Sequence, residues 1–184
     1  NIVNQPQRPL MAIIGGAKIS DKIDVLHKFI AIADCLAVVG AVANNFLVGH
    51  GIKIGKSLFD PDAIRETEIA WNLVKAEEKK RAFSFLLSVD AVVSKSIEGQ
   101  APTRIVDLSS YSLADIEAYP RKPQPSLYTV GSDELILDIG PISAAMIAGA
   151  VKLARTVVWG GTAGVTETKG LAGAQAPFAH GSRM

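Results

Sequence analysis

The sequence has very little cysteine and almost no excess of charge. Cys35 is the only cysteine among 184 residues, so neither an internal disulfide nor a thiolate metal cluster can form within the chain. A single cysteine suits a reducing compartment, and we predict a cytoplasmic protein. Nineteen basic residues against 18 acidic ones leave a net charge of +1. Because no basic patch stands out, we expect neither nucleic acid nor a membrane as a partner.

Long hydrophobic runs are also missing. The longest apolar stretch, Phe29 to Gly49, is interrupted by Asp34, Asn44 and Asn45, which makes it too polar to span a membrane. The first ten residues are polar and contain prolines, so they do not resemble a signal peptide. With 48% hydrophobic and 20% charged residues, the composition is that of a soluble globular protein, and the length fits one domain.

Short apolar runs alternate with longer amphipathic segments along most of the chain. The expected strands are Leu10–Ile14, Leu36–Val39, Phe83–Leu87, Val89–Val93 (as an extended run), Leu135–Ile139 and Thr156–Trp159. The expected helices follow Gly15-Gly16 with Ser20 as N-cap, cover Val42–Val48, begin at Asp60-Pro61, and run from Gly140-Pro141 to about Leu153. Residues 98–128 hold four prolines and are expected to form a loop with one or two short strands.

This alternation of strand, glycine and helix predicts an α/β fold. We expect a three-layer, Rossmann-like arrangement in which a parallel sheet carries helices on both faces. No internal repeat and no linker divides the chain, so residues 1–184 are expected to form a single domain. Ligands of such sheets bind outside the carboxyl ends of the strands. Those ends carry glycine or aspartate and predict one crevice: Gly15-Gly16, Gly40, the Asp90 region, Asp138–Gly140 and Gly160-Gly161.

The segment from Gly15 to Lys22 is the most specific feature of the sequence. A glycine pair after a strand allows a tight turn that brings backbone N–H groups close to an anion, and a following helix adds its positive end. Lys18 and Lys22 share a face if both are helical, so together they suggest a polyphosphate site. On spacing alone, a plain turn with two solvated lysines is the commoner explanation. The spacing is that of neither a Walker loop nor a dinucleotide fingerprint, and no acid follows Gly40 to hold a ribose.

Five segments, in order, resemble those of phosphoglycerate kinases. They are Gly15-Gly16-Ala17-Lys18-Ile19-Ser20-Asp21-Lys22-Ile23, Ile54-Gly55-Lys56-Ser57-Leu58, Val89-Asp90-Ala91-Val92-Val93, Leu137-Asp138-Ile139-Gly140-Pro141, and Thr156-Val157-Val158-Trp159-Gly160-Gly161 running to Gly164-Val165 and Glu167. The resemblance covers Arg8 to about Ser182, nearly all of this chain but about half of a two-domain kinase. It identifies the chain as similar to the C-terminal, nucleotide-binding domain of that family.

The resemblance implies a glycolytic transferase that moves the acyl phosphate of 1,3-bisphosphoglycerate to Mg-ADP, giving ATP and 3-phosphoglycerate. It implies that Lys18 contacts the nucleotide phosphates and that Lys22 stabilises the phosphoryl group in transit, a role suited to phosphoryl transfer. Glu167 stands where the family has the carboxylate that binds the ribose. The implied nucleotide-binding residues are Gly15, Gly16, Ala17, Lys18, Gly40, Leu137, Gly160, Gly161 and Glu167. The implied cofactors are ATP or ADP with Mg²⁺, and no residue of this chain is expected to be a metal ligand.

Several positions depart from the family pattern. Gly160 replaces an asparagine that helps to place the phosphates, Thr162 replaces a proline, and Thr166 replaces a phenylalanine. Ala41 and Ile136 each stand where the family has glycine, and they add side-chain atoms where the flat base is expected to pass close to the backbone. These changes favour an alternative interpretation, a binding module that kept the fold and lost turnover, whereas Lys18, Lys22 and Glu167 favour a kinase.

The sequence also lacks two parts that the family uses. The N-terminal domain that holds 3-phosphoglycerate is absent, and so is a Gly-Gly-Gly-Asp-Thr segment whose aspartate serves magnesium. We therefore expect the chain alone to be inactive and its incomplete sheet edge to favour self-association. His27, His50 and His180 match no family role and are expected to be surface histidines.

Overall fold

The computed structural model describes residues 6–98, 101–109 and 129–165. A parallel four-stranded sheet in the order β3-β2-β1-β7 forms the centre of the fold. Its strands are β1 (Leu10–Ile14), β2 (Cys35–Val38), β3 (Ser84–Leu86) and β7 (Thr156–Gly160). Every residue of β1 is buried, as expected of an inner parallel strand that is covered on both faces.

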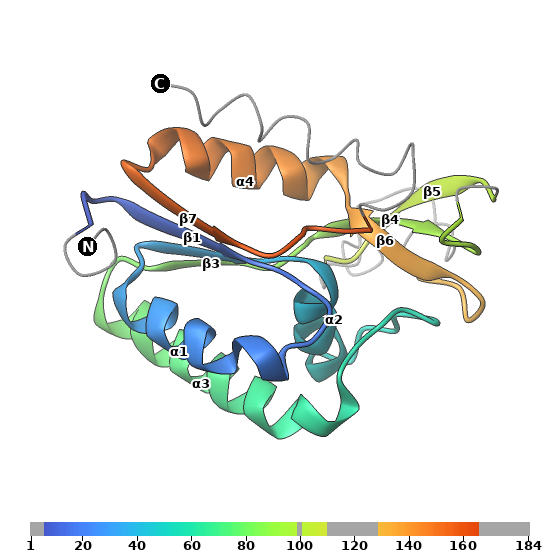
Figure 1. Cartoon of the computed structure of the whole chain (residues 1–184), viewed down its shortest axis with the longest axis horizontal. Coiled ribbons are helices and arrows are strands. Elements are labelled where there is room, and N and C mark those ends of the chain that lie inside the picture. Colours follow the sequence, from blue (N-terminus) through green and yellow to red (C-terminus); the bar gives the residue numbers. More distant parts are fainter. Residues whose placement is uncertain (1–5, 99–100, 110–128, 166–184) are drawn as a thin grey trace, which may run out of the picture.

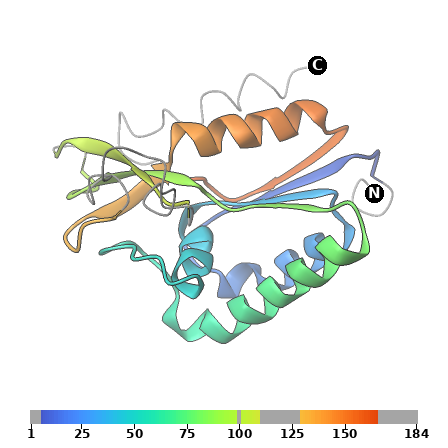
Figure 2. The ribbon, with the colours of Figure 1, turned by 180° about the vertical axis from the view of Figure 1, so that it is seen from behind.

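Helices cover both faces of this sheet. Helices α1 (Ile23–Ile32), α2 (Gly40–Gly49) and α3 (Ile64–Lys80) lie on one side, and α4 (Pro141–Leu153) lies on the other (Figure 1, with the reverse view in Figure 2). Alternate residues of β1 enter different cores, with Ala12 in the cluster beneath α1 and α3 and Met11 in the cluster beneath α4. The three-layer α/β fold predicted from the sequence is confirmed.

A second, antiparallel sheet lies beside the first and was not expected. Its order is β5-β4-β6, with β4 at Asp90–Ser94, β5 at Thr103–Asp107 and β6 at Leu135–Ile139. It stands at the end of the parallel sheet where β1 and β7 finish (Figure 1). A third core cluster joins α2, through Leu47, to Ala91 and Val106 of this sheet. The apolar runs predicted the strands but not their direction, because an apolar run does not encode strand orientation.

Two helix starts differ from the prediction. Ser20 does not cap a helix: a 3-10 turn occupies Ser20–Lys22, α1 begins at Ile23, and the Ser20 hydroxyl donates to Asp60 Oδ2 at 2.7 Å. Asp60 likewise makes no side-chain cap, and a 3-10 turn at Pro61–Ala63 precedes α3. Both side chains bond to each other instead, which ties the start of α1 to the start of α3.

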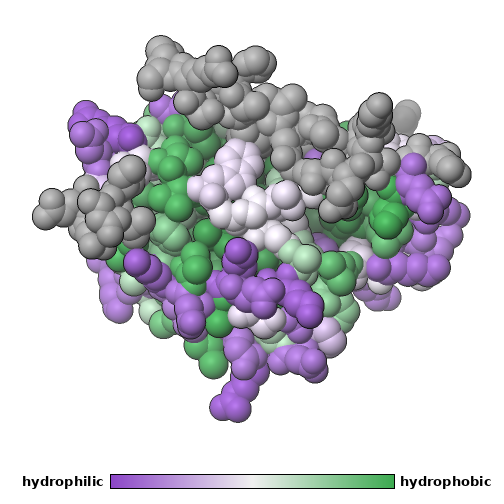
Figure 3. Space-filling model, viewed as in Figure 1, coloured by the Kyte–Doolittle hydropathy of each residue, from purple (hydrophilic) through white to green (hydrophobic). Residues whose placement is uncertain are grey.

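The outer surface of α4 and β7 carries exposed apolar side chains. On α4, Ile142 is 60% exposed and Leu153 is 77% exposed, and on β7 both Val157 and Trp159 are 40% exposed. Figure 3 shows apolar side chains gathered at this side of the molecule. Among the described strands β7 pairs only with β1. The self-association expected from the sequence stays a prediction. No helix in the described ranges is both long and apolar enough to cross a membrane.

Candidate functional site

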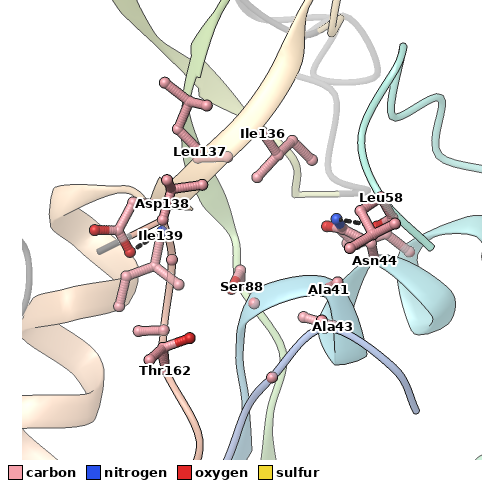
Figure 4. Close-up of a pocket in the computed structure, with 18 of the residues that line it drawn as sticks. Ala41, Ala43, Asn44, Leu58, Ser88, Ile136, Leu137, Asp138, Ile139 and Thr162 are labelled. Atoms are coloured by element: carbon pink, nitrogen blue, oxygen red, sulfur yellow. Dashed lines mark hydrogen bonds between the residues drawn. The ribbon is translucent and has the colours of Figure 1, made fainter. Parts of the chain in front are cut away.

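A pocket of about 230 Å³ opens where the two sheets meet. Residues surround it from the turns after β1 and β2, from α2, from β4 and the segment before it, from the residue after β5, from β6 and from the segment after β7 (Figure 4). The single crevice predicted from the strand ends is therefore present, although two of its walls come from the antiparallel sheet. Its lining residues are Gly16, Ala17, Gly40, Ala41, Ala43, Asn44, Leu47, Leu58, Ser88, Ala91, Leu108, Ile136, Leu137, Asp138, Ile139, Thr162, Ala163, Gly164 and Val165.

Glycine turns form one end of this pocket, which we call the glycine end. Gly15 donates its N–H to Gly160 O at 2.8 Å. A Cβ atom on Gly15 would lie 2.2 Å from Thr162 O, and one on Gly161, where φ is +102°, would lie 2.2 Å from Gly15 O. Because real Cβ contacts are never that short, only glycine allows the turns after β1 and β7 to touch. The N–H of Gly16 has no acceptor among the described residues and is available to an anion.

The two lysines of the glycine-rich turn differ in position. Lys22 is half-buried, and its Cε would lie 3.7 Å from a Cβ atom on Gly16, so its chain runs along the turn. Lys18 is exposed, and neither lysine is among the residues that line the pocket. The condition that both lysines be helical is not met, because Lys18 precedes the 3-10 turn. Lys22 therefore lies against the glycine-rich turn beside the pocket, whereas Lys18 is exposed.

The opposite end of the pocket, which we call the apolar end, is built mainly from hydrophobic side chains. Leu58 lies across the open space from Ile136 and Leu137, which are consecutive residues of β6 (Figure 4). Asn44 enters this wall from α2 and donates its Nδ2 to Leu58 O at 2.8 Å. A slot with apolar walls and few polar groups suits a flat heterocycle.

Asp138 occupies an unusual position beside the pocket. Its residue is only 4% exposed, and its Oδ1 accepts a hydrogen bond of 2.8 Å from the N–H of Ile139. Its carboxylate turns toward α4 rather than into the open space (Figure 4). Burial disfavours the charged form and raises the pKa of Asp138 to about 6, and the Ile139 bond offsets part of this effect. A Cβ on Gly164 would lie 2.6 Å from this carboxylate, so Asp138 packs directly against the segment after β7.

Asp90 has a structural position at the start of β4. It is 1% exposed and accepts hydrogen bonds from Ile142 N at 2.9 Å, from Ser143 N at 2.8 Å and from the Ser143 hydroxyl at 2.5 Å. Asp90 thus satisfies the N-terminus of α4 from another strand, the role of a helix cap. The positive end of α4 is therefore already occupied by a carboxylate.

The predicted site residues fall into five groups. Gly16, Ala17, Gly40 and Leu137 line the pocket. Gly15, Gly160 and Gly161 form the turns behind it, Lys22 lies along these turns, and Lys18 is exposed. Glu167 lies outside the described residues, as do Thr166 and His180.

The pattern of the sequence missed several pocket residues. Asn44, Leu58 and Leu108 reach the pocket from segments far apart in the chain. One usable signal was present, since Asn44 and Asn45 are adjacent amides inside an apolar helix. The Asn45 amide bonds at both ends to the backbone of Asp60, donating to its carbonyl oxygen at 2.7 Å and accepting from its N–H at 2.9 Å. Of the two asparagines, Asn44 is therefore the one that faces the pocket.

The histidines and possible metal ligands can be placed in the described part of the chain. His50 is exposed, as expected, with Nδ1 2.6 Å from Phe46 O. The prediction of a surface histidine is wrong for His27. This residue is half-buried, and its Nε2 is buried without a hydrogen-bond partner among the described residues. No group of three or more His, Cys, Asp or Glu side chains in the described ranges could hold a metal.

Comparison with known proteins gives a consistent result. The family described as phosphoglycerate kinase matches residues 1–181. A phosphoglycerate kinase of Chloroflexus aurantiacus is 36% identical over 98% of this chain and 38% of its own length, and one of Desulforapulum autotrophicum is 35% identical over 99% and 39%. The structure of phosphoglycerate kinase from Coxiella burnetii superposes with a TM-score of 0.79 at 30% identity, covering 98% of this chain and 40% of that one.

A more distant structure supports the fold alone. Phosphoglycerate kinase from Pyrococcus horikoshii superposes with a TM-score of 0.64 at 20% identity and covers 96% of this chain. The chain spans about two fifths of the length of the relatives that it matches.

Proposed function

This chain belongs to the phosphoglycerate kinase family, and from that premise we propose that its pocket binds the adenine nucleotide, ADP or ATP with Mg²⁺, of the phosphoglycerate kinase reaction. One observation carries the proposal: a glycine end beside Lys22 and an apolar end share one pocket at the carboxyl ends of the strands. Such edges are where parallel α/β sheets bind nucleotides. In this proposal residues 1–184 form one nucleotide-binding domain of a two-domain cytoplasmic enzyme.

The glycine end is the place for the phosphates. The free N–H of Gly16 and the ammonium of Lys22 both supply positive charge there, and backbone N–H groups of such turns bind anions. In the transfer step, Lys22 neutralises charge that develops on the oxygens of the moving phosphoryl group, which is the main catalytic requirement of this chemistry. The exposed Lys18 joins only if its side chain swings inward, so its contribution is the smaller of the two.

The apolar end is the place for the base. Leu58 and Leu137 provide walls for a flat ring, while Ala41 and Ile136 narrow the slot. Mg²⁺ arrives on the nucleotide phosphates in this proposal, since it bridges phosphate oxygens in phosphoryl transfer. The ribose is assigned to Glu167 by family resemblance alone.

The partner substrate requires a part of the enzyme that this chain does not supply. The relatives are about two and a half times longer, and we propose that the acyl phosphate donor is held by a further domain. The alternative is a nucleotide-binding module without turnover. Ala41 and Ile136 favour this alternative, because both line the pocket at positions where the family has glycine and they narrow the space for the base.

Calorimetric titration with Mg-ADP tests the proposal. We expect the intact chain to bind, Lys22→Ala to bind about tenfold to a hundredfold more weakly because a charge-assisted contact is lost, and Lys18→Ala to show a smaller loss. Lys28→Ala is the matched control, since Lys28 is an exposed lysine on α1 outside the pocket. Binding that is unchanged in Lys22→Ala would contradict the assignment of the glycine end, and no binding at all would refute the nucleotide site.

A coupled assay for ATP formation separates the kinase from the non-catalytic module. We expect no turnover by this chain alone. Turnover at kinase-like rates would show that no further domain is needed.

A further inference from the structure

Four of the residues that line the pocket have polar side chains: Asn44, Ser88, Asp138 and Thr162. The Asp138 carboxylate is directed toward α4 (Figure 4). Thr162 belongs to the glycine end, where its carbonyl oxygen approaches Gly15 and Gly40. Asn44 and Ser88 are therefore the polar side chains that remain for a ligand at the apolar end.

Asn44 is held in one orientation. Its Nδ2 donates to Leu58 O at 2.8 Å, and since a carbonyl can only accept, this bond determines which end of the amide is which. Oδ1 consequently faces the open space of the pocket (Figure 4). The residue is 4% exposed, and no donor to Oδ1 exists among the described residues. Oδ1 itself is not among the buried unpartnered atoms, so it is open to solvent from the pocket. A base that covers Oδ1 without offering a donor leaves this acceptor unpaired, which is unfavourable.

We propose that Asn44 determines which base the pocket selects: its Oδ1 accepts a hydrogen bond from an exocyclic amino group, so that a 6-aminopurine is preferred over a 6-oxopurine. This inference rests on the nucleotide site proposed above. A 6-oxo group would place a second acceptor opposite Oδ1, where two lone pairs repel.

The amide cannot serve both kinds of base equally. Rotation of the Asn44 side chain by half a turn would present its N–H groups to a 6-oxo group. That rotation would also break the bond to Leu58 O and leave Oδ1 facing this carbonyl. The backbone at Leu58 thus makes the acceptor orientation the lower in free energy, and a fixed acceptor discriminates by rejecting ligands that cannot satisfy it.

Titration of the intact chain with three magnesium diphosphates tests the inference without any mutation. The ligands are ADP, purine riboside 5′-diphosphate, which lacks the 6-substituent, and IDP, which has a 6-oxo group. We expect ADP to bind about threefold to tenfold more tightly than the purine analogue, as for one hydrogen bond, and IDP to bind most weakly. Equal affinities would overturn the role of Asn44 and leave the nucleotide site standing. Binding of none of the three would overturn the nucleotide site and this inference with it.

A pair of variants assigns the preference to one side chain. In Asn44→Leu the ratio of ADP to purine-analogue affinity should fall to within about twofold, because no acceptor remains. Asn72→Leu, at an exposed asparagine on α3 that does not line this pocket, should keep the full ratio. Since each ratio is measured within one protein, a loss of folded material cancels. A ratio that survives in Asn44→Leu overturns the inference.

Discussion

The parallel and antiparallel sheets contribute to the same pocket by different means. The parallel sheet supplies turns whose backbones touch, as where Gly15 meets Gly161. The antiparallel sheet supplies side chains of β6, Ile136 and Leu137 among them. A contact between two backbones tolerates almost no added atom, whereas a wall of side chains can repack at modest cost. Substitutions on the two sides should therefore differ in size and in kind.

The largest effect is expected at the turn after β1. In Gly15→Val the new Cβ would meet Thr162 O at 2.2 Å and a Val39 methyl at 2.8 Å, and the former is backbone that cannot move aside alone. We expect a loss of at least about 3 kcal/mol in the free energy of unfolding, together with loss of nucleotide binding. Urea denaturation followed by circular dichroism measures the first and calorimetry the second.

Gly49→Ala is the control for Gly15→Val, because it adds a side chain at a glycine that no other segment touches. Gly49 ends α2, and a Cβ there meets nothing within 4 Å. Alanine in a helix should leave stability unchanged or raise it by about 0.5–1 kcal/mol. Similar losses in both variants would show that the contact between the turns is not what requires Gly15.

A smaller but still large effect is expected where the antiparallel sheet joins α4. Asp90→Ala removes the acceptor for three donors of Ile142 and Ser143, and the two donors of Ser143 are buried. We expect a loss of about 3 kcal/mol, as for a buried helix cap that cannot be replaced by water. Asp24→Ala, at an exposed carboxyl on α1, is the control and should change the urea midpoint very little. A midpoint in Asp90→Ala equal to that control would contradict the capping role.

The third substitution, Asp138→Asn, is expected to raise the free energy of unfolding rather than lower it, and its effect depends on pH. The pKa of Asp138 is raised from 3.8 to about 6, so the folded state binds a proton more tightly than the unfolded state does. Its favourable contribution is full below about pH 4 and is lost as the pH rises through about 6. In Asp138→Asn the group stays neutral and keeps its acceptor for Ile139 N–H. We expect the variant to match the wild type at pH 4 and to exceed it by about 2 kcal/mol at pH 7.5.

Urea titrations of the two proteins at both pH values measure this difference. Subtraction of one protein from the other removes the contributions of all other titrating groups. A stability difference that does not change between pH 4 and pH 7.5 would show that Asp138 titrates normally in the folded chain.

The contrast between the two sheets also explains what the sequence could predict. The order of strands and helices and the glycine end were recognisable because they depend on neighbours in the chain, such as Gly15 next to Gly16. The direction of β4 and β6 was not, since an apolar run reads the same in either direction. The position of Asn44 opposite Leu137 depends on tertiary packing between α2 and β6 and has no local signature. Ser20 illustrates the same limit, because its partner Asp60 is forty residues away.

The contact between the first and last described strands has a consequence for folding. Leu10 pairs with Thr156 and Ile14 with Gly160, so the glycine end forms only after segments near both ends of the described chain have met. Closing so long a loop is entropically costly, and topologies with such distant contacts fold slowly. A chain emerging from the ribosome would hold β1, β2 and their helices with the binding pocket still unmade until β7 has been synthesised.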